Sequence, residues 1–314
     1  MQFLAARGLA PNAAPPSVTR SNPALRKFRA WLRQYRGVSE ATIHNYEREV
    51  TALLPGLGTD TRLYDAARVR ESLIRRLENV SRHHALQVTQ AARMYLRYLV
   101  ANGDCPPTIV NAVPKCPAWN LSTLPRHISM EKVERLIASC DPKGRAGLRD
   151  RAVLLLLARL GLRAGDVLGL RLNDIDWPNA RLRVCGKTRR ATWLPLPQDV
   201  GDSLLEYLEK ARPRVNEEIV FLRANAPPRP FSHSGAITAI VRYALRRAGM
   251  HEVTYRGANL LRHSAATELL RSGASLNAVA ALLRHRSTDT SQIYAKVDVG
   301  LLQHVAQPWI GGAR

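Results

Sequence analysis

The sequence predicts a mainly α-helical protein that contains one small antiparallel β-sheet. Apolar residues recur at helical spacing on both sides of a proline-rich stretch near residues 106–125. Between residues 170 and 196 the apolar residues alternate instead, in short runs separated by polar turns, which is typical of strands. Hydrophobic residues make up 46% of the 314 residues, enough for a sizeable core, so a wholly disordered basic chain is excluded.

The N-terminal third predicts an arm followed by a small helical domain. Residues 1–22 are rich in Ala and Pro, lack helical periodicity, and are expected to form a flexible arm. Residues 23–105 are expected to form an all-helical unit, with Ser39 as one candidate N-cap and helical patterns over 23–36, 39–54 and 80–100. The polar faces of these helices are rich in arginine, which suits either a solvated surface or one that faces DNA. The net charge of the chain favours the second interpretation.

A linker is expected over residues 106–126, where prolines follow one another closely. Proline removes a backbone donor and does not fit a helix interior, so the segment predicts an extended connection. A connection of this length could reach across a DNA duplex, because extended chain spans about 3.3 Å per residue. The prolines concerned are Pro106, Pro107, Pro114, Pro117 and Pro125.

The second domain is expected over residues 127–314, with a small sheet between helices. Ser129 is a candidate cap for its first helix, and a mostly apolar helix over 144–162 is expected to end at Gly161. Gly273 stands where a helix C-terminus needs a glycine, and Ser275 can cap the helix that follows. Strands are expected over 170–177, 181–187 and 191–196, and later helices over 200–213, 232–250, 259–273 and 275–285.

The charge of the chain predicts a polyanionic partner. Lys and Arg number 47 against 25 Asp and Glu, a net charge of +22. Duplex DNA is the favoured partner of such a chain, and an anionic membrane surface or RNA is the alternative. Four widely spaced cysteines predict neither a zinc site nor a disulfide framework. The longest apolar run, residues 152–158, is too short to span a bilayer, so a cytoplasmic protein without a membrane partner is expected.

Polar residues of the second domain fall into short motifs that run in a fixed order. Each one alone has a plain structural explanation, such as a helix-surface ion pair, a turn lysine, a capping asparagine or a half-buried tyrosine. They are Arg163 and Asp166 in GLRAGDVLGLRLNDIDW, Lys187 in VCGKTRR, Asn259 and Arg262 in NLLRHSAATELL, His285 in LLRHRS and Tyr294 in TSQIYAKV.

Taken together, these motifs resemble those of the tyrosine recombinase (phage integrase) family, in its Xer/integrase-like form. Lys187 follows Arg163 by 187 − 163 = 24 residues, and Tyr294 follows His285 by 294 − 285 = 9. The resemblance implies a helical, SAM-like core-binding domain and a tyrosine recombinase catalytic domain. It implies a site-specific recombinase that cleaves and rejoins duplex DNA through a 3′-phosphotyrosyl intermediate, for integration, excision or transposition of a mobile element. No metal or nucleotide cofactor is implied.

The resemblance also implies a role for each motif residue. Planar guanidiniums suit a phosphate because each donates two hydrogen bonds and stays protonated. The implied roles are attack on the phosphodiester by Tyr294, charge stabilisation by Arg163 and Arg262, orientation of Arg163 or its surroundings by Asp166, protonation of the leaving oxygen by Lys187, and a contact to the phosphate or to Tyr294 by His285.

One residue departs from the family pattern, which usually has histidine where this chain has Asn259. Asparagine can donate a hydrogen bond to a phosphate oxygen but cannot carry charge or shuttle a proton near neutral pH. Retained but slower catalysis is therefore expected. His263 also has a counterpart in the family motif, and a structural role is expected for it. The alternatives are a catalytically weakened DNA-binding protein of the same fold and a type IB topoisomerase-like enzyme that needs no specific partner site.

The resemblance further implies an assembly on DNA. The apolar residues after Tyr294 could pack on the chain's own core or on a neighbouring subunit. The second arrangement implies a homo-tetramer on two specific DNA sites, acting alone or with a related recombinase, in the cytoplasm and in association with the nucleoid.

Overall fold

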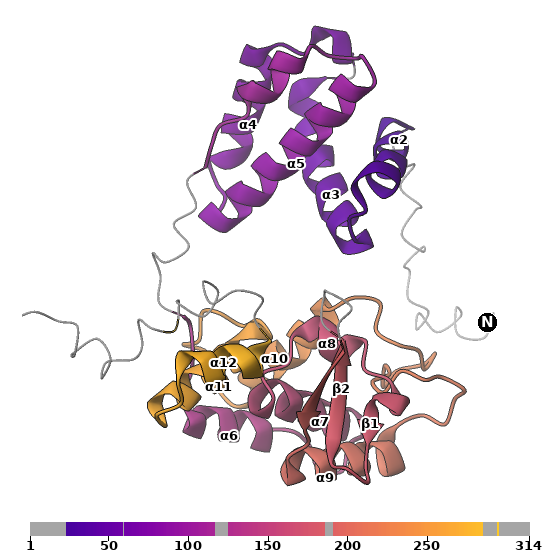
Figure 1. Ribbon diagram of the computed structural model, residues 1–314, viewed down its shortest axis with the longest axis vertical. Helices are drawn as coiled ribbons and strands as arrows, with labels where there is room; N and C mark the ends of the chain where they lie inside the picture. The colour runs from indigo at the N-terminus through magenta and orange to yellow at the C-terminus, as the bar shows by residue number, and fades with distance from the viewer. Residues whose placement is uncertain (1–22, 59, 117–124, 186–190, 285–293, 295–314) are drawn as a thin grey trace, which may run out of the picture. The chain divides into compact units, whose positions relative to one another are not determined.

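The computed structural model describes residues 23–58, 60–116, 125–185, 191–284 and 294. The chain divides into two compact units, Met1–Trp119 and Asn120–Arg314 (Figure 1). The expected bounds of the arm and of the two domains stay a prediction.

The described part of the first unit is helical. Its long helices are α2 (Pro23–Trp31), which continues into a π-helical turn (Leu32–Arg36), α3 (Glu40–Leu57), α4 (Ala66–Leu77) and α5 (Arg82–Ala101). A 3-10 turn (Thr61–Leu63) precedes α4. Helix α3 packs along α5 and against α4, and their apolar faces meet that of α2 around Phe28, Val50, Leu73 and Tyr95.

Local capping residues explain where these helices begin. Ser39 accepts a hydrogen bond from the backbone N–H of Thr42, as predicted, and Asp65 caps α4 through Arg68 in the same way. Helix α4 was not among the predicted helical segments. Its charged face carries four arginines, and only a narrow apolar stripe that includes Val69 and Leu73 reaches the core.

The prediction of an extended linker over residues 106–126 is wrong for the first part of that segment. Pro107–Ala112 forms 3-10 turns, with proline in the first turn, where its missing N–H is not needed. Ile109, Ala112 and Val113 are buried in the core of the first unit. The physical reason is that a run of mostly apolar residues lies between Pro107 and Pro114, and their burial outweighs the preference for an extended chain.

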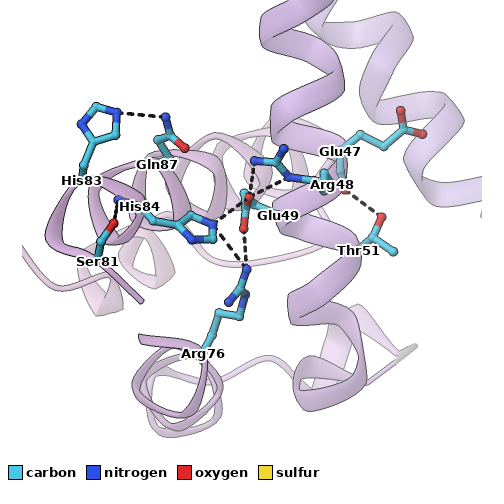
Figure 2. A network of polar contacts seen from close by, with 9 residues as sticks. All are labelled: Glu47, Arg48, Glu49, Thr51, Arg76, Ser81, His83, His84 and Gln87. Atoms are coloured by element: carbon cyan, nitrogen blue, oxygen red, sulfur yellow. Dashed lines mark hydrogen bonds and ion pairs between the residues drawn. The ribbon is translucent and has the colours of Figure 1, made fainter. Parts of the chain in front are cut away.

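A buried carboxylate joins three helices of the first unit. Glu49 on α3 is 1% exposed and accepts hydrogen bonds from Arg48, from Arg76 on α4 at 2.9 Å, and contacts His84 Nε2 on α5 at 3.0 Å (Figure 2). Burial raises the pKa of Glu49, but the hydrogen bonds from Arg48 and His84 outweigh it and hold the pKa below its ordinary value. The carboxylate is therefore an anion that fixes α4 and α5 to α3.

Replacing Glu49 with alanine is expected to lower the free energy of unfolding of the first unit by about 2–4 kcal/mol. The loss leaves three cationic or polar partners without their acceptor, and their partial exposure to water keeps the cost below that of a fully buried ion pair. Amide hydrogen exchange in α3, α4 and α5 of the full chain measures it. Glu71→Ala, which breaks an exposed pair with Arg75, is the control and should change this free energy by no more than about 0.5 kcal/mol. Equal effects of the two substitutions would contradict the assignment.

The second unit is built around one helix that is buried on nearly all sides. Helix α7 (Arg145–Arg159) is apolar without interruption over residues 152–158, and each of these residues is buried. It packs against α6 (Met130–Ala138), α9 (Gln198–Glu206), α10 (Gly235–Arg247) and α11 (Asn259–Arg271) (Figure 1). The other helical elements of the described unit are short, namely α8 (Ala164–Leu168), a 3-10 turn (Leu172–Asp174), a π-helical turn (Tyr207–Ala211) and α12 (Leu276–Leu283).

The predicted antiparallel sheet is present. Strands β1 (Ile175–Asp176), β2 (Arg181–Cys185) and β3 (Ala191–Pro195) pair in that order, and Arg183 faces Trp193 across the last pair. Leu182 and Val184 point into the core while their neighbours in β2 do not, which is the alternation that predicted the strand. The mainly α fold class with a small sheet is confirmed.

Helix ends in the second unit also follow their predicted signals. Ser129 and Ser275 each accept the backbone N–H three residues ahead, at the starts of α6 and α12. Gly273 adopts φ +87° directly after α11, where a left-handed residue favours glycine. Within the part of the chain that the structure describes, no helix is long and apolar enough to cross a membrane.

Candidate active site

The loop after α7 and the end of α12 come together beside α11. Gly161 ends the α7 segment at φ +56°, and a Cβ there would lie 2.8 Å from Leu283 Cδ2. Glycine is thus required both by the backbone conformation and by the close approach of the two segments. This approach places the residues on either side of Gly161 next to the C-terminal residues of α12.

Arg262 on α11 bridges these two segments. Its guanidinium donates through Nη1 to the carbonyl of Gly161 and through Nη2 to the carbonyl of Leu283. The residue is 4% exposed. Burial, and then the nearby Arg163, lower the pKa of Arg262 to about 10, so the guanidinium remains cationic at neutral pH.

Arg163 stands at the N-cap of α8, half-buried beside Arg262. Its backbone N–H donates to Asp166 Oδ2 at 3.0 Å, and its Nη2 donates to the carbonyl of Arg284 at 3.3 Å. Asp166 therefore holds the main chain of Arg163, while its own side chain is only 6% exposed. The carboxylate forms its ion pair with Arg284, at 2.6 Å from Nη2.

Arg284 is a third buried guanidinium of the site, and the sequence motifs did not single it out. It ends α12 in the left-handed conformation, φ 51°, which turns its side chain back toward α8. Its Nε and Nη1 are buried and have no hydrogen-bond partner among the described residues. Burial lowers the pKa of Arg284, and Asp166 opposes that shift. The only sequence signal was an arginine directly before the motif residue His285.

The hydroxyl of Tyr294 lies against the same helix. Tyr294 is 1% exposed, and its Oη is 2.7 Å from Nδ1 of His263, the residue that follows Arg262. Burial raises the pKa of Tyr294 to about 12, although the charges of Arg262 and Arg163 lower it. Burial, and then Arg262, lower the pKa of His263 to about 4, so its ring is neutral at neutral pH. The tyrosine is therefore a neutral phenol that contacts an imidazole and lies within electrostatic reach of two guanidiniums.

The free energy of unfolding of the second unit should depend on pH through His263. Its pKa falls from 6.5 to about 4 on folding, so between these values the unfolded chain binds the extra proton. The free energy of unfolding is therefore complete above about pH 6.5 and should fall by about 2–3 kcal/mol as the pH drops toward 4. Denaturant unfolding of the full chain at several pH values, compared with His263→Asn, isolates this contribution. Identical pH profiles for the two proteins would contradict it.

The structure brings together four of the seven residues predicted for the site. These are Arg163, Asp166, Arg262 and Tyr294. Asn259 is exposed in the first turn of α11, one turn before Arg262. Lys187 and His285 lie outside the described residues.

The arrangement suits a phosphate group. The site contains the guanidiniums of Arg163, Arg262 and Arg284 and the carboxylate of Asp166, which pairs with Arg284, so the cluster is cationic. Such donors are fixed in place before a ligand arrives, and they match the charge that gathers on phosphoryl oxygens during phosphoryl transfer. Among the described residues, no group of three or more His, Cys, Asp or Glu side chains could hold a metal ion.

Comparison with known proteins decides the family. The model of the phage integrase family matches residues 126–300, more than half of the chain. The chain belongs to the phage integrase family. It is a tyrosine recombinase, an enzyme of site-specific DNA recombination that transfers DNA strands, and the family and enzyme class predicted from the motifs are confirmed.

Individual relatives agree with this membership. "Putative integrase/recombinase y4rA" of Sinorhizobium fredii is 41% identical over 287 residues, which cover 90% of this chain and 70% of that protein. "Putative integrase/recombinase y4rF" of the same organism is 38% identical over 72% of this chain, which spans about half of that relative. "Tyrosine recombinase XerD" of Listeria innocua is 28% identical over 88% of this chain and 94% of its own length.

Solved structures of tyrosine recombinases share the fold. XerH recombinase bound to a palindromic difH substrate matches with a TM-score of 0.67 at 19% identity, over 91% of this chain and 84% of that one. A lambda integrase(75-356) dimer bound to a COC′ core site matches with a TM-score of 0.65 at 18% identity, over 92% of this chain and 98% of that one.

Proposed function

We propose that this recombinase breaks and rejoins duplex DNA at a specific site, with Tyr294 as the nucleophile. The observation that carries the proposal is the position of the Tyr294 hydroxyl, which is close enough to Arg163 and Arg262 for both charges to lower its pKa. Tyr294 Oη forms a bond to the scissile phosphorus while the bond from phosphorus to O5′ breaks. The 3′-phosphotyrosyl link keeps the phosphodiester energy available for rejoining, so the reaction needs no energy source.

Arg163 and Arg262 bind the non-bridging oxygens of the scissile phosphate. Without DNA both guanidiniums donate to carbonyls of the chain's own loops. A phosphate offers charged acceptors in place of these neutral ones, and a charge-assisted hydrogen bond is roughly twice as strong as a neutral one. Asp166 supports the site because it fixes the main chain of Arg163 and pairs with Arg284.

Lys187 and His285 keep the roles that the motifs imply. Lys187 gives its proton to the leaving O5′, and His285 hydrogen-bonds the phosphate or assists Tyr294. Asn259 lies on the same face of α11 as Arg262, three residues before it, and donates a hydrogen bond to a phosphate oxygen. None of these steps requires a metal or nucleotide cofactor.

The proposal also includes a DNA partner and an assembly on it. The titles of similar structures describe XerH with a difH substrate and a lambda integrase tetramer on a Holliday junction. We assign to this chain a specific duplex site, two such sites held by a homo-tetramer, and contacts to DNA from both of its domains. The function served is movement of a mobile element at the nucleoid, by this protein alone or with a related recombinase.

Covalent capture tests the reaction. A binding site selected from a random duplex library is placed in a substrate nicked near the cleavage position, so that the cleaved fragment diffuses away and the adduct accumulates. The expected product is a denaturant-resistant protein–DNA adduct with a free 5′-hydroxyl, formed in the presence of a chelator. Binding without an adduct favours the catalytically weakened alternative. Relaxation of plasmids that lack the site favours the topoisomerase-like one.

Replacing Asn259 with histidine is expected to accelerate cleavage of this substrate by about 10-fold or more. The imidazole donates the same hydrogen bond and adds a charge or a proton that an amide cannot supply, and general acid–base groups contribute roughly 10²–10⁴-fold when well placed. Single-turnover rates at saturating DNA measure the effect. Asn259→Gln, which keeps the amide, is the matched control and should give no acceleration. An unchanged rate for Asn259→His would show that asparagine is no handicap.

A further inference from the structure

His263 contacts the oxygen that reacts. The sequence motifs suggested only a structural role for it, yet its Nδ1 lies 2.7 Å from Tyr294 Oη, with the two ring centroids 5.6 Å apart and the rings tilted by 50°. A separation of 2.7 Å is a short hydrogen bond, well inside the range over which a proton is shared or passed. His263 is thus placed to act on the nucleophile.

The neutral state of the His263 ring leaves one of its two nitrogens able to accept a proton. Its buried ring is neutral at neutral pH, so one ring nitrogen carries a lone pair and the other a hydrogen. The Tyr294 phenol is also neutral and must lose its proton to attack phosphorus. A neutral phenol beside a neutral imidazole nitrogen donates its O–H to that nitrogen when the imidazole carries its hydrogen on Nε2.

We propose that His263 is a catalytic base that takes the proton of Tyr294 through Nδ1 as Oη attacks the scissile phosphorus. This inference rests on the proposed function and adds to it the group that activates the nucleophile. The Oη–P bond forms, the P–O5′ bond breaks, the phenol proton moves to Nδ1, and O5′ receives a different proton from the general acid. In rejoining, Nδ1 returns its proton to Tyr294 as O5′ attacks the phosphotyrosine.

The surroundings of His263 suit this exchange. Arg262 and His127 are the charged or titratable groups that act on it, and His127 in turn contacts Arg271. When a phosphodiester binds Arg262, its negative charge offsets the guanidinium that disfavours protonation of His263. The base is therefore stronger when DNA occupies the site. Leu270, Val279 and Leu283 pack around Tyr294 and limit the access of water to it.

Asn259 makes such a base more valuable in this chain. The amide at that position has no group that takes up a proton near neutral pH. His263 lies one residue after Arg262 on the same helix, so the element that positions the phosphate ligand also positions the proton acceptor. Helix α11 therefore fixes the guanidinium of Arg262 and the ring of His263 relative to one another.

The test compares His263→Asn, His263→Gln and His263→Ala with the wild-type chain in single-turnover cleavage of the nicked duplex. The amides keep a polar atom near the position of Nδ1 but cannot take up a proton, so all three variants are expected to cleave about 10²–10³-fold more slowly. Imidazole in the buffer is expected to restore part of the rate of His263→Ala. His251→Asn, which removes an exposed histidine outside the site, should stay within about twofold of wild type.

A second substrate distinguishes loss of the general base from loss of the general acid. With sulfur in place of the bridging O5′, the leaving group needs no proton, so sulfur should restore Lys187→Ala and leave His263→Asn slow. Restoration of His263→Asn by sulfur, or a rate for either amide variant within about threefold of wild type, overturns the proposal. Melting curves and DNA affinity check that the variants fold. If the two amide variants do not fold, imidazole rescue of His263→Ala still decides the proposal. If the wild-type chain forms no adduct at all, it is the proposed function that fails.

Discussion

Tyr294→Phe is expected to abolish the covalent protein–DNA adduct, with cleavage reduced by at least about 10⁴-fold. The substitution removes one oxygen, the atom that bonds to phosphorus, and nothing else in the described site can replace it as a nucleophile within electrostatic reach of Arg163 and Arg262. Gel separation under denaturing conditions, with DNA labelled on either side of the nick, measures both the adduct and the free end.

The same variant should fold and bind DNA normally. The ring packs in an apolar cluster with Ala266, Leu270, Val279 and Leu283, and phenylalanine keeps that packing. Loss of the hydroxyl leaves Nδ1 of His263 without this partner, at a cost of about 1 kcal/mol in unfolding free energy. A persistent adduct in Tyr294→Phe would assign the nucleophile to another residue, while loss of DNA binding would show that the hydroxyl serves the fold.

Features that depend on neighbours in the sequence could be predicted. Ser39, Ser129 and Ser275 cap helices because the N–H groups they bind belong to the next turn. The sheet followed from alternation within single strands and from the short turns between them. Motif order and spacing identified Arg163, Arg262 and Tyr294, which the fold does gather in one place.

Features that depend on packing between distant segments could not be predicted. The Asp166 carboxylate was expected to orient Arg163 or its surroundings, and it does bind the main chain of Arg163, but its ion-pair partner is Arg284, 118 residues away in the sequence. The contact of His263 with Tyr294 spans 31 residues and needs both side chains to turn toward the same space. In the first unit, burial of Ile109 and Val113 outweighed the preference for an extended chain that the nearby prolines indicate. Each case is decided by tertiary burial, which local patterns do not encode.

Arg262→Lys is expected to slow cleavage by about 10²–10³-fold at saturating DNA, the usual loss when one preorganised donor to the transition state is removed. The guanidinium has two donor ends, which reach the carbonyls of Gly161 and Leu283 in the absence of DNA. A lysine ammonium is a single point charge and cannot span both carbonyls, so it also orients a phosphate less well. Single-turnover rates on the nicked substrate measure the loss.

A control substitution at an exposed arginine distinguishes an effect on the cleavage rate from an effect on DNA binding. Arg246 on α10 is exposed, and its replacement by alanine should weaken DNA binding at most severalfold and reduce its salt dependence, with no change in the cleavage rate of bound DNA. Arg262→Lys should show the reverse pattern, because the net charge of the chain is unchanged while the geometry at the phosphate is lost. Full activity of Arg262→Lys would mean that positive charge alone suffices at this position. The buried fork between Gly161 and Leu283 would then serve to join α7 to α12, and the transition state would depend on Arg163 and on the buried donors of Arg284.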